Sequence, residues 1–278
     1  MKKIFIACSM LVAITTAATA QVKMPAPSPT QTIKQDFGLG SIELVYSRPV
    51  AKGRKVMGDL VPYNKVWRTG ANAATLIKFT APVEISGKKV DTGTYALYTI
   101  PGENTWEVIL NKGITNWGSD GYSEAADVIR VKVDAKKNKD FVESFTMQFS
   151  DVKASTCKLN IMWEKTSIEI PIGAYNLNAV IRTQLEDGLK MATKRPYWQA
   201  AQFYNELDNN PAKALENVKM AVTDNPKAFW MWIYKAKIEK AMGDKTAARV
   251  SAKTSLDLAT AAKNDDYIKM NQDLLKTL

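Results

Sequence analysis

Apolar and polar positions alternate with a period of two over much of the first half of the chain. The alternation is clearest in DVIRVKV (127–133), SFTMQFS (144–150), KLNIMWE (158–164) and SIEIPI (167–172). This period is typical of strands with one buried and one solvated face, as in antiparallel sheets. Turn residues recur at short intervals, at Ser86-Gly87, Asp91-Thr92-Gly93, Pro101-Gly102 and Lys112-Gly113, as in sandwiches and barrels. We therefore predict an antiparallel β domain, sandwich or barrel-like, over residues 32–172.

The pattern changes to a helical spacing after Gly173. A helix is expected over 176–194, and another over about 265–277. Both would cap an all-α domain that we place at residues 173–278.

Between these two helices the chain repeats itself at an interval of 34 residues. The interval relates Trp198 to Trp232 and Ala214 to Ala248. Thirty-four residues is the length of the tetratricopeptide repeat, a pair of antiparallel helices whose small residues allow close packing. Residues 196–262 thus resemble two such repeats, although the second lacks the closing proline. An unrelated bundle of helical hairpins is the alternative.

The first twenty residues have the composition of a secretory signal peptide. Lys2 and Lys3 precede an apolar run, and Ala18-Thr19-Ala20 provides small residues at a cleavage site. We predict a signal peptide at 1–20, a linker at 21–31, and an exported protein, periplasmic or secreted. No later segment is apolar for long enough to span a membrane.

Composition excludes several kinds of chemistry. The chain contains no histidine and two cysteines, of which only Cys157 follows the predicted cleavage site. Histidine-dependent catalysis, histidine-ligated zinc and CxxC redox pairs are therefore excluded, and we expect neither a metal nor a cofactor.

The positive charge is spread evenly, at +4 in residues 21–172 (20 − 16) and +4 in residues 173–278 (16 − 12). Nucleic acid binding usually requires a clustered excess, so none is expected. The lysine-rich spots at 88–89 and 136–139 are interpreted as solvated turns.

Arginine is concentrated in one short stretch. Three of the seven arginines, Arg48, Arg54 and Arg68, fall within YSRPVAKGRKVMGDLVPYNKVWRTGAN (46–72). Arginine differs from lysine by its flat fork of donors and by its ability to stack on aromatic rings. Two interpretations follow. The three guanidinium groups fix loops onto the sheet by hydrogen-bonding to carbonyls and carboxylates, or they converge on a pocket for an anionic ligand.

The strings YSRP, GR, VWRTGAN and GTYALYTIP resemble an uncharacterised bacterial family, domain of unknown function 2911. The similarity extends over roughly 27–172, and WGSDGYSEAADVIRV places Asp127 and Arg130 at recurring acidic and basic positions of that family. The resemblance implies export but supplies no activity. With it, the candidate ligand-binding residues are Tyr46, Arg48, Arg54, Trp67, Arg68, Asn72, Asp127 and Arg130.

These observations predict a non-enzymatic binding or scaffold protein of the cell envelope. A protein or peptide partner would bind the helical repeat, and an anionic small molecule or glycan would bind near the arginines. Alternatively, the apolar helix faces around Phe229, Trp230 and Ile233 are buried against the β domain and the tail is a brace. A further alternative is a histidine-free hydrolase or lyase acting on an envelope glycan. It would use two carboxylates drawn from Glu43, Asp59, Asp120 and Asp127.

Overall fold

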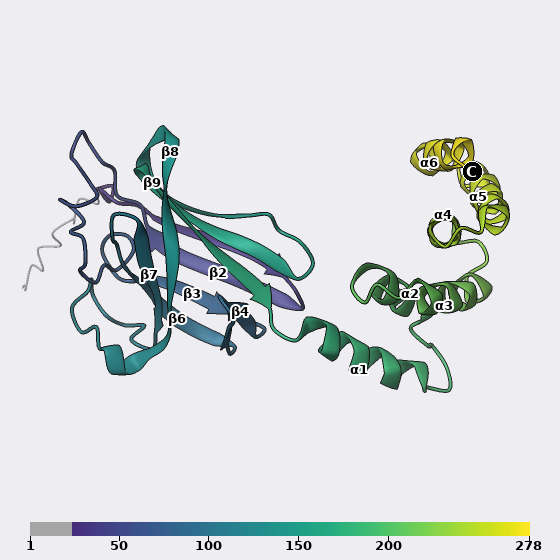
Figure 1. Ribbon diagram of the computed structural model, residues 1–278, viewed down its shortest axis with the longest axis horizontal. Helices are drawn as coiled ribbons and strands as arrows, with labels where there is room; N and C mark the ends of the chain where they lie inside the picture. Colours follow the sequence, from purple (N-terminus) through teal and green to yellow (C-terminus); the bar gives the residue numbers. More distant parts are fainter. Residues whose placement is uncertain (1–23) are drawn as a thin grey trace, which may run out of the picture.

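The computed structural model describes residues 24–278, a β sheet followed by helices (Figure 1). The expected signal peptide, its cleavage site and the start of the linker lie outside the described residues. Within residues 24–278, no helix is both long enough and apolar enough to cross a membrane.

Nine strands form one antiparallel sheet in the described part of the chain, as the period-two alternation predicts. The sheet order is β1-β2-β3-β6-β7-β8-β9-β4-β5. The strands are β1 (Thr30–Phe37), β2 (Gly40–Ser47), β3 (Thr75–Phe79), β4 (Val83–Ile85), β5 (Lys88–Val90), β6 (Gly93–Ile100), β7 (Thr105–Asn111), β8 (Asp127–Ser150) and β9 (Thr156–Ala174).

The sheet curves because β8 is long enough to pair with two different partners along its length. Its first part pairs with β7, and from Ala135 onward it pairs with β9. The segment after β2 then reaches across to β8, with Ala51 N donating to Glu143 O (2.9 Å) and Phe145 N donating to Pro49 O (2.8 Å). We call this contact between residues 48–51 and 143–146 the seam. It joins the β2 side of the curved sheet to β8 around one core.

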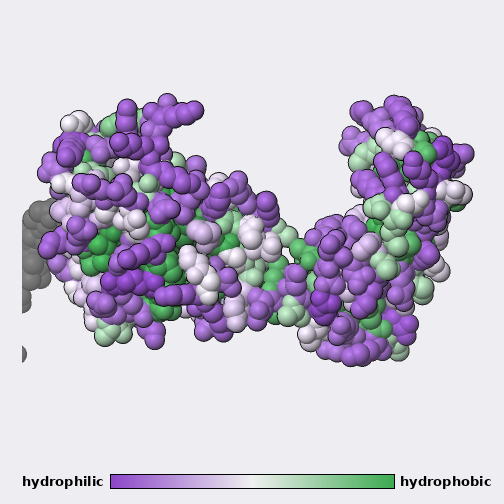
Figure 2. Space-filling view, viewed as in Figure 1, coloured by the Kyte–Doolittle hydropathy of each residue, from purple (hydrophilic) through white to green (hydrophobic). Residues whose placement is uncertain are grey.

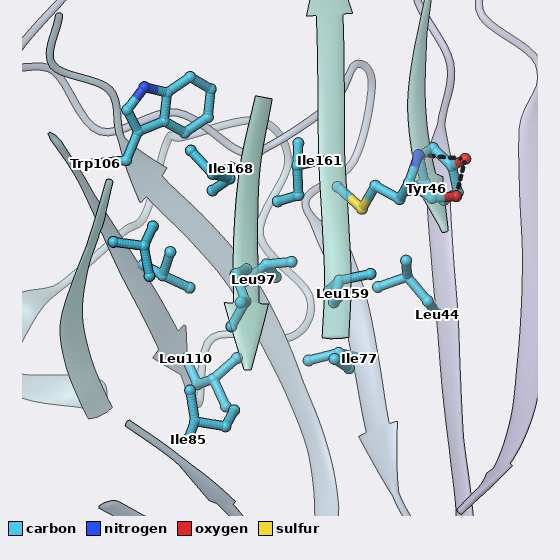
Figure 3. Packing of buried hydrophobic residues seen from close by; sticks show 14 of the residues in the cluster. Leu44, Tyr46, Ile77, Ile85, Leu97, Trp106, Leu110, Leu159, Ile161 and Ile168 are labelled. Atoms are coloured by element: carbon cyan, nitrogen blue, oxygen red, sulfur yellow. Dashed lines mark hydrogen bonds between the residues drawn. The ribbon is translucent and has the colours of Figure 1, made fainter. Parts of the chain in front are cut away.

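The inner face of the sheet is a large apolar core, in which aliphatic side chains pack with Trp106 and Tyr46 (Figure 3). Trp67 stacks on Trp163 at 6.0 Å between ring centroids and meets Phe145 edge-on at 5.2 Å. In β8 the buried residues are the apolar members of the two alternating runs, Ile129, Val131 and Val133 near its start and Phe145 and Met147 near its end. Because each fully buried residue of this size contributes about 1.5–3 kcal/mol, the core is the main source of stability for this half.

The two lysine-rich spots lie in strands, so their interpretation as turns is wrong. Lys88 and Lys89 belong to β5, and Lys136 and Lys137 pair with β9 inside β8. Their side chains point to solvent while their backbones make ladder bonds. At an edge strand such as β5, lysines also discourage pairing with other chains.

The described chain ends in six helices, which we call the tail. They are α1 (Leu177–Leu189), α2 (Tyr197–Glu206), α3 (Pro211–Asp224), α4 (Phe229–Ala241), α5 (Lys245–Ala261) and α6 (Asp265–Lys276). Asn210, Asp244 and Asn264 cap α3, α5 and α6 by accepting a backbone N–H three residues ahead. From α2 onward each helix packs on the next, and together they follow a curve away from the sheet (Figure 1).

Residues related by the 34-residue interval occupy equivalent places in the tail. Trp198 and Trp232 lie on the first helix of successive pairs, and Ala214 and Ala248 are fully buried on the second. These positions support a repeated helix pair, and its membership of the tetratricopeptide class stays a prediction. Trp230 is 42% exposed, so this part of α4 is not buried against the sheet.

Candidate functional site

The connection between β7 and β8 folds over the outer face of the sheet. This connection, residues 112–126, covers a second apolar cluster that includes Tyr98 and Ile109. Asn111, fully buried, holds both of its ends: its amide donates to Ser123 O (2.9 Å) and its Oδ1 accepts from Gly113 N (2.7 Å). We call residues 112–126 the outer loop.

A bulge places Asp127 and Arg130 on the same side of β8. Leu110 pairs with Ile129 whereas Asn111 pairs with Asp127, so Val128 is an extra residue in the ladder. Residues three apart on a regular strand face opposite sides, and one extra residue reverses that relation. Both charged side chains therefore reach the outer face, beside the outer loop.

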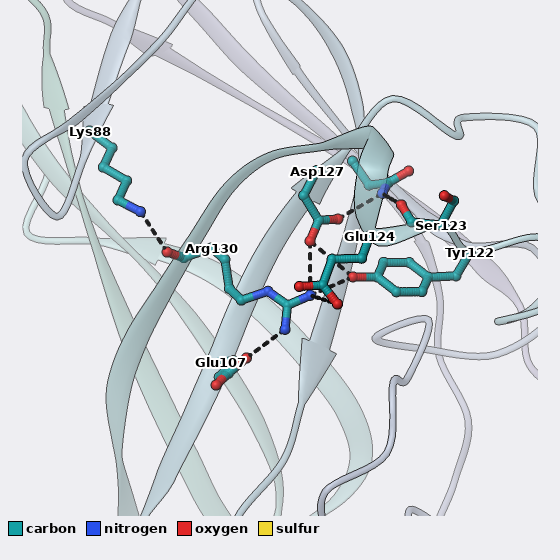
Figure 4. A network of polar contacts seen from close by, with 8 residues as sticks. Lys88, Glu107, Tyr122, Ser123, Glu124, Asp127 and Arg130 are labelled. Atoms are coloured by element: carbon teal, nitrogen blue, oxygen red, sulfur yellow. Dashed lines mark hydrogen bonds and ion pairs between the residues drawn. The ribbon is translucent and has the colours of Figure 1, made fainter.

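Arg130 is the centre of a polar network (Figure 4). Its guanidinium donates to Glu107 Oε2 (3.1 Å), to Asp127 Oδ2 (2.9 Å) and to the Tyr122 hydroxyl (2.8 Å). Glu124, on the short helix η1 (Glu124–Ala126), lies 3.5 Å away and is largely exposed. We call Glu107, Tyr122, Glu124, Asp127 and Arg130 the Arg130 network.

The Arg130 network is saturated with internal partners. Tyr122 also donates to Asp127 Oδ2 (2.9 Å), and burial, followed by this hydrogen bond, raises the pKa of its hydroxyl to about 12. The hydrogen bond that Arg130 donates to Asp127 likewise raises the pKa of the guanidinium, so the cation is permanent. Because the N–H groups of the Arg130 guanidinium already donate to several acceptors, few donors remain for a further anion.

The carboxylates proposed for a hydrolase lie on separate elements. Glu43 has Lys34 and Lys78 as its cross-strand neighbours, and Asp59 and Asp120 are exposed. Asp127 belongs to the Arg130 network. The acidic side chains that do meet, in that network, meet around a shared arginine rather than across an open cleft.

Arg48 and Arg54 are bonded to the chain itself. Arg48 donates from Nε to Phe145 O (3.1 Å) and from Nη2 to Thr146 Oγ1 (2.9 Å), across the seam. Arg54 donates to Ala51 O (2.9 Å) and to Val50 O (2.7 Å). For these two residues the geometry matches the structural interpretation of the arginine-rich stretch.

Three other candidate residues serve the packing of the same region. Tyr46 is buried, and its hydroxyl accepts from Met147 N (2.9 Å). Trp67 lies in the core, and its ring nitrogen donates to Gly70 O (3.1 Å). Asn72 is exposed, with a left-handed backbone, and donates to Ser47 Oγ and to Ser28 O (both 3.2 Å). Tyr46 and Trp67 are therefore not on an open surface.

Arg68 differs from the other two arginines of the stretch. Its Nε is buried without a hydrogen-bond partner, and within residues 24–278 its guanidinium makes no ion pair. The side chain lies under the outer loop at Gly118, where an added Cβ would be 3.3 Å from Arg68 Nη1. Gly118 also has φ +67°, so both space and backbone favour glycine there. The neighbouring Trp117 is 69% exposed.

The Arg130 network and the ends of the outer loop depend on two residues that the sequence analysis did not single out. Glu107 and Asn111 are polar residues near the ends of TWEVILN, a strand that is otherwise mostly buried. Polar residues in such a strand need partners, and that is the signal by which they could have been found. Their partners could not be named, because these depend on the register of β7 against β8.

The described residues show no further reactive centre. No three acidic or cysteine side chains among them come together as a possible metal site. Cys157 is buried, and desolvation raises the pKa of its thiol to about 11. A thiol of that kind is protonated and unreactive at neutral pH.

Comparison with known proteins gives a family for the first half of the chain. A family model described as "Protein of unknown function (DUF2911)" matches residues 28–172. The match ends before the tail begins. No curated protein and no solved structure matches the chain.

Proposed function

The chain belongs to the family of proteins of unknown function DUF2911, and from that premise we propose that it is a non-enzymatic binding protein. In this proposal it is exported to the cell envelope. The sheet holds an anionic group at Arg68, and the tail binds a protein or peptide partner. Mass spectrometry of the protein from its native envelope tests the export step, for which we expect a chain that begins at Gln21.

The observation that carries the anion site is that the Arg68 guanidinium has no hydrogen-bond or ion-pair partner among residues 24–278. A buried guanidinium nitrogen without a hydrogen bond costs free energy comparable to a lost bond, so natural proteins rarely leave one. The flat fork of arginine fits carboxylate and phosphate groups through two parallel bonds. Trp117 is exposed and precedes Gly118, the residue that lies over Arg68, so it offers an apolar face for a sugar ring. A carboxylate-bearing sugar would use both groups.

Titration calorimetry with galacturonate and with inorganic phosphate tests the anion site. We expect saturable binding of at least one of them, weakened about tenfold or more in Arg68→Gln, because a charge-assisted hydrogen bond contributes about 1.5–3 kcal/mol. Arg54→Gln is the matched control and should bind as the unchanged protein does. Equal affinity in the two variants, or binding of neither probe, contradicts the site.

The tail supports the second half of the proposal through an exposed aromatic surface on α4 and α6. Phe229 lies 5.1 Å from Trp230 and 4.8 Å from Tyr267 between ring centroids, and Trp230 is 42% exposed. Tryptophan and tyrosine are common anchors of protein interfaces. Stacked helix pairs also generally present extended binding surfaces.

Capture from envelope extract by the immobilised full chain tests this surface. Trp230→Ala should lose a partner that Val250→Ala retains, since Val250 is an exposed residue on the neighbouring helix α5. Identical capture by both variants argues against a platform centred on α4.

A histidine-free hydrolase has no comparable support. Such an enzyme needs two carboxylates about 5–10 Å apart in an open cleft. In the described residues, Glu107 and Asp127 both pair with Arg130. Asp151 and Glu169 likewise share Lys158, so these carboxylates are compensated by a cation.

A further inference from the structure

A cavity of about 250 Å³ lies where the sheet meets the first helix of the tail. Its floor consists of buried apolar side chains from both sides of that junction: Phe37, Ile42, Val83 and Leu177. Its rim carries Leu39, 55% exposed, and Val180, 42% exposed. Figure 2 shows hydrophobic residues gathered on the surface where the two halves join.

The local backbone explains why this space is not filled. After β9 the chain passes through Tyr175 to Asn176, which adopts a left-handed conformation (φ 52°) just before α1. Tyr175 N donates to Pro82 O (3.1 Å) and fixes the start of this turn. The turn directs α1 away from the sheet, and the wall opposite is formed by the small Ala81 and by Ala174.

Four of the residues that line this cavity have polar side chains: Ser41, Lys89, Tyr175 and Asn176. Lys89 is the one charged residue among the described residues that line it, and its ammonium lies 5.3 Å from the centroid of the Tyr175 ring, another wall residue. Asn176 occupies the N-cap of α1, but its side chain makes no capping hydrogen bond. The amide of Asn176 is thus a donor without a structural task.

Lys89 keeps its charge and retains donors for a ligand. Its ammonium pairs with Asp91 at 2.6 Å, and both side chains are largely solvated. The hydrogen bond that Lys89 donates to Asp91 raises the pKa of the ammonium. An exposed pair of this kind is weak, and an ammonium has three donors, so Asp91 does not exclude a second acceptor.

We propose that this cavity binds a small amphipathic carboxylate, with its hydrocarbon body on the apolar floor and its carboxylate between Lys89 and Asn176. An apolar floor with few convergent polar groups is the usual composition of a small-molecule site. A cavity of about 150 Å³ accepts benzene, so this one accepts a chain of about eight carbons. It is too small for a lipid with two acyl chains.

Because Leu177 and Val180 belong to α1, the occupant contacts the sheet and the tail at once. Binding therefore stabilises the joint between them. The inference is independent of the anion site at Arg68, which lies under the outer loop, and Arg68→Gln should bind the carboxylate unchanged.

Titration calorimetry of octanoate against the chain from Gln21, with 1-octanol as the uncharged probe, tests the proposal at pH 7. We expect one saturable site, with octanoate bound about fivefold more tightly than octanol. Lys89→Ala should remove that preference, a change of the size of one exposed ion pair. Lys88→Ala is the control, because Lys88 donates to Arg130 O instead and does not line the cavity.

A second pair of variants examines the apolar wall without altering a buried residue. Val180→Asp should lower octanoate affinity about tenfold, and Val250→Asp, the same change at an exposed helical position elsewhere, should not. The proposal is overturned if the native chain binds neither probe saturably. It is equally overturned if Val180→Asp and Val250→Asp bind octanoate alike, or if Lys89→Ala leaves the preference for octanoate intact.

Discussion

At the scale of single residues, the three clustered arginines perform different tasks. Arg48 and Arg54 each give two donors to the protein's own oxygens, and Arg48 spans the seam. Lysine, a point charge, could not make the same pair of bonds with fixed geometry. Among residues 24–278, Arg68 makes no such bonds.

Lysine substitutions separate the two roles. Arg48→Lys should lower the free energy of unfolding by about 1–2 kcal/mol, because at least one partly buried bond to the seam is lost. Arg68→Lys should change it by less than about 0.5 kcal/mol. Urea denaturation of both variants measures the difference. Equal losses would mean that Arg68 has a structural partner after all.

The sequence could present these two roles as alternatives but could not assign them. The acceptors of Arg48 lie 97 and 98 residues further along the chain. Which residues of β8 face Arg48 depends on the irregular register between β8 and β9, and no local pattern encodes it. The same limit applies to Glu107, whose partner Arg130 is set by strand pairing.

At the scale of elements, the α4–α5 contact contains a buried ion pair. Glu239 is 2% exposed and pairs with Lys235 at 2.9 Å. Ser251 on α5 donates to Glu239 Oε2 (2.7 Å) and accepts from Lys235 Nζ (2.9 Å). Every member of this group depends on the others, because a buried charge without a partner is costly.

Removing Lys235 should therefore destabilise the tail strongly. Lys235→Met is expected to cost about 3 kcal/mol, since it leaves Glu239 charged and unpaired. Lys237→Met, at an exposed position on the same helix, is the control. The double variant Lys235→Met/Glu239→Leu should recover most of the loss. If it does not, shape rather than charge governs this interface. Thermal unfolding followed by circular dichroism at 222 nm measures all three.

Periodicity predicted the elements well, although it gave some of their limits less closely. The helix expected over 176–194 ends at Leu189. An added Cβ at Gly188 would lie 2.8 Å from Pro196 Cγ, so the chain folds back on this helix, a contact that no spacing reveals. The lysines of β5 and β8 were interpreted as turns for a related reason. A solvent-exposed part of a strand can be as rich in lysine as a turn is, so composition does not distinguish the two.

At the scale of the whole molecule, the sheet and the tail have separate cores. The clusters of the sheet and those of the tail share no residue. Elements with independent cores unfold as independent cooperative units when the contact between them is small.

Scanning calorimetry should accordingly resolve two transitions. Lys235→Met should lower the midpoint of one and leave the other in place, while Arg48→Lys should do the opposite. A single transition that moves with either substitution would mean that the junction at α1 couples the two halves into one unit.

The seam has a consequence for how the chain reaches this structure. Joining Arg48 to Phe145 closes a loop of nearly a hundred residues. The part of the entropic free-energy cost that depends on loop length is about 4 kcal/mol for a loop of this size. Such long-range pairings form slowly, whereas contacts between successive helices involve neighbours in sequence and form quickly. The tail, although it is synthesised after the sheet, can complete its own contacts sooner after synthesis than the sheet that precedes it.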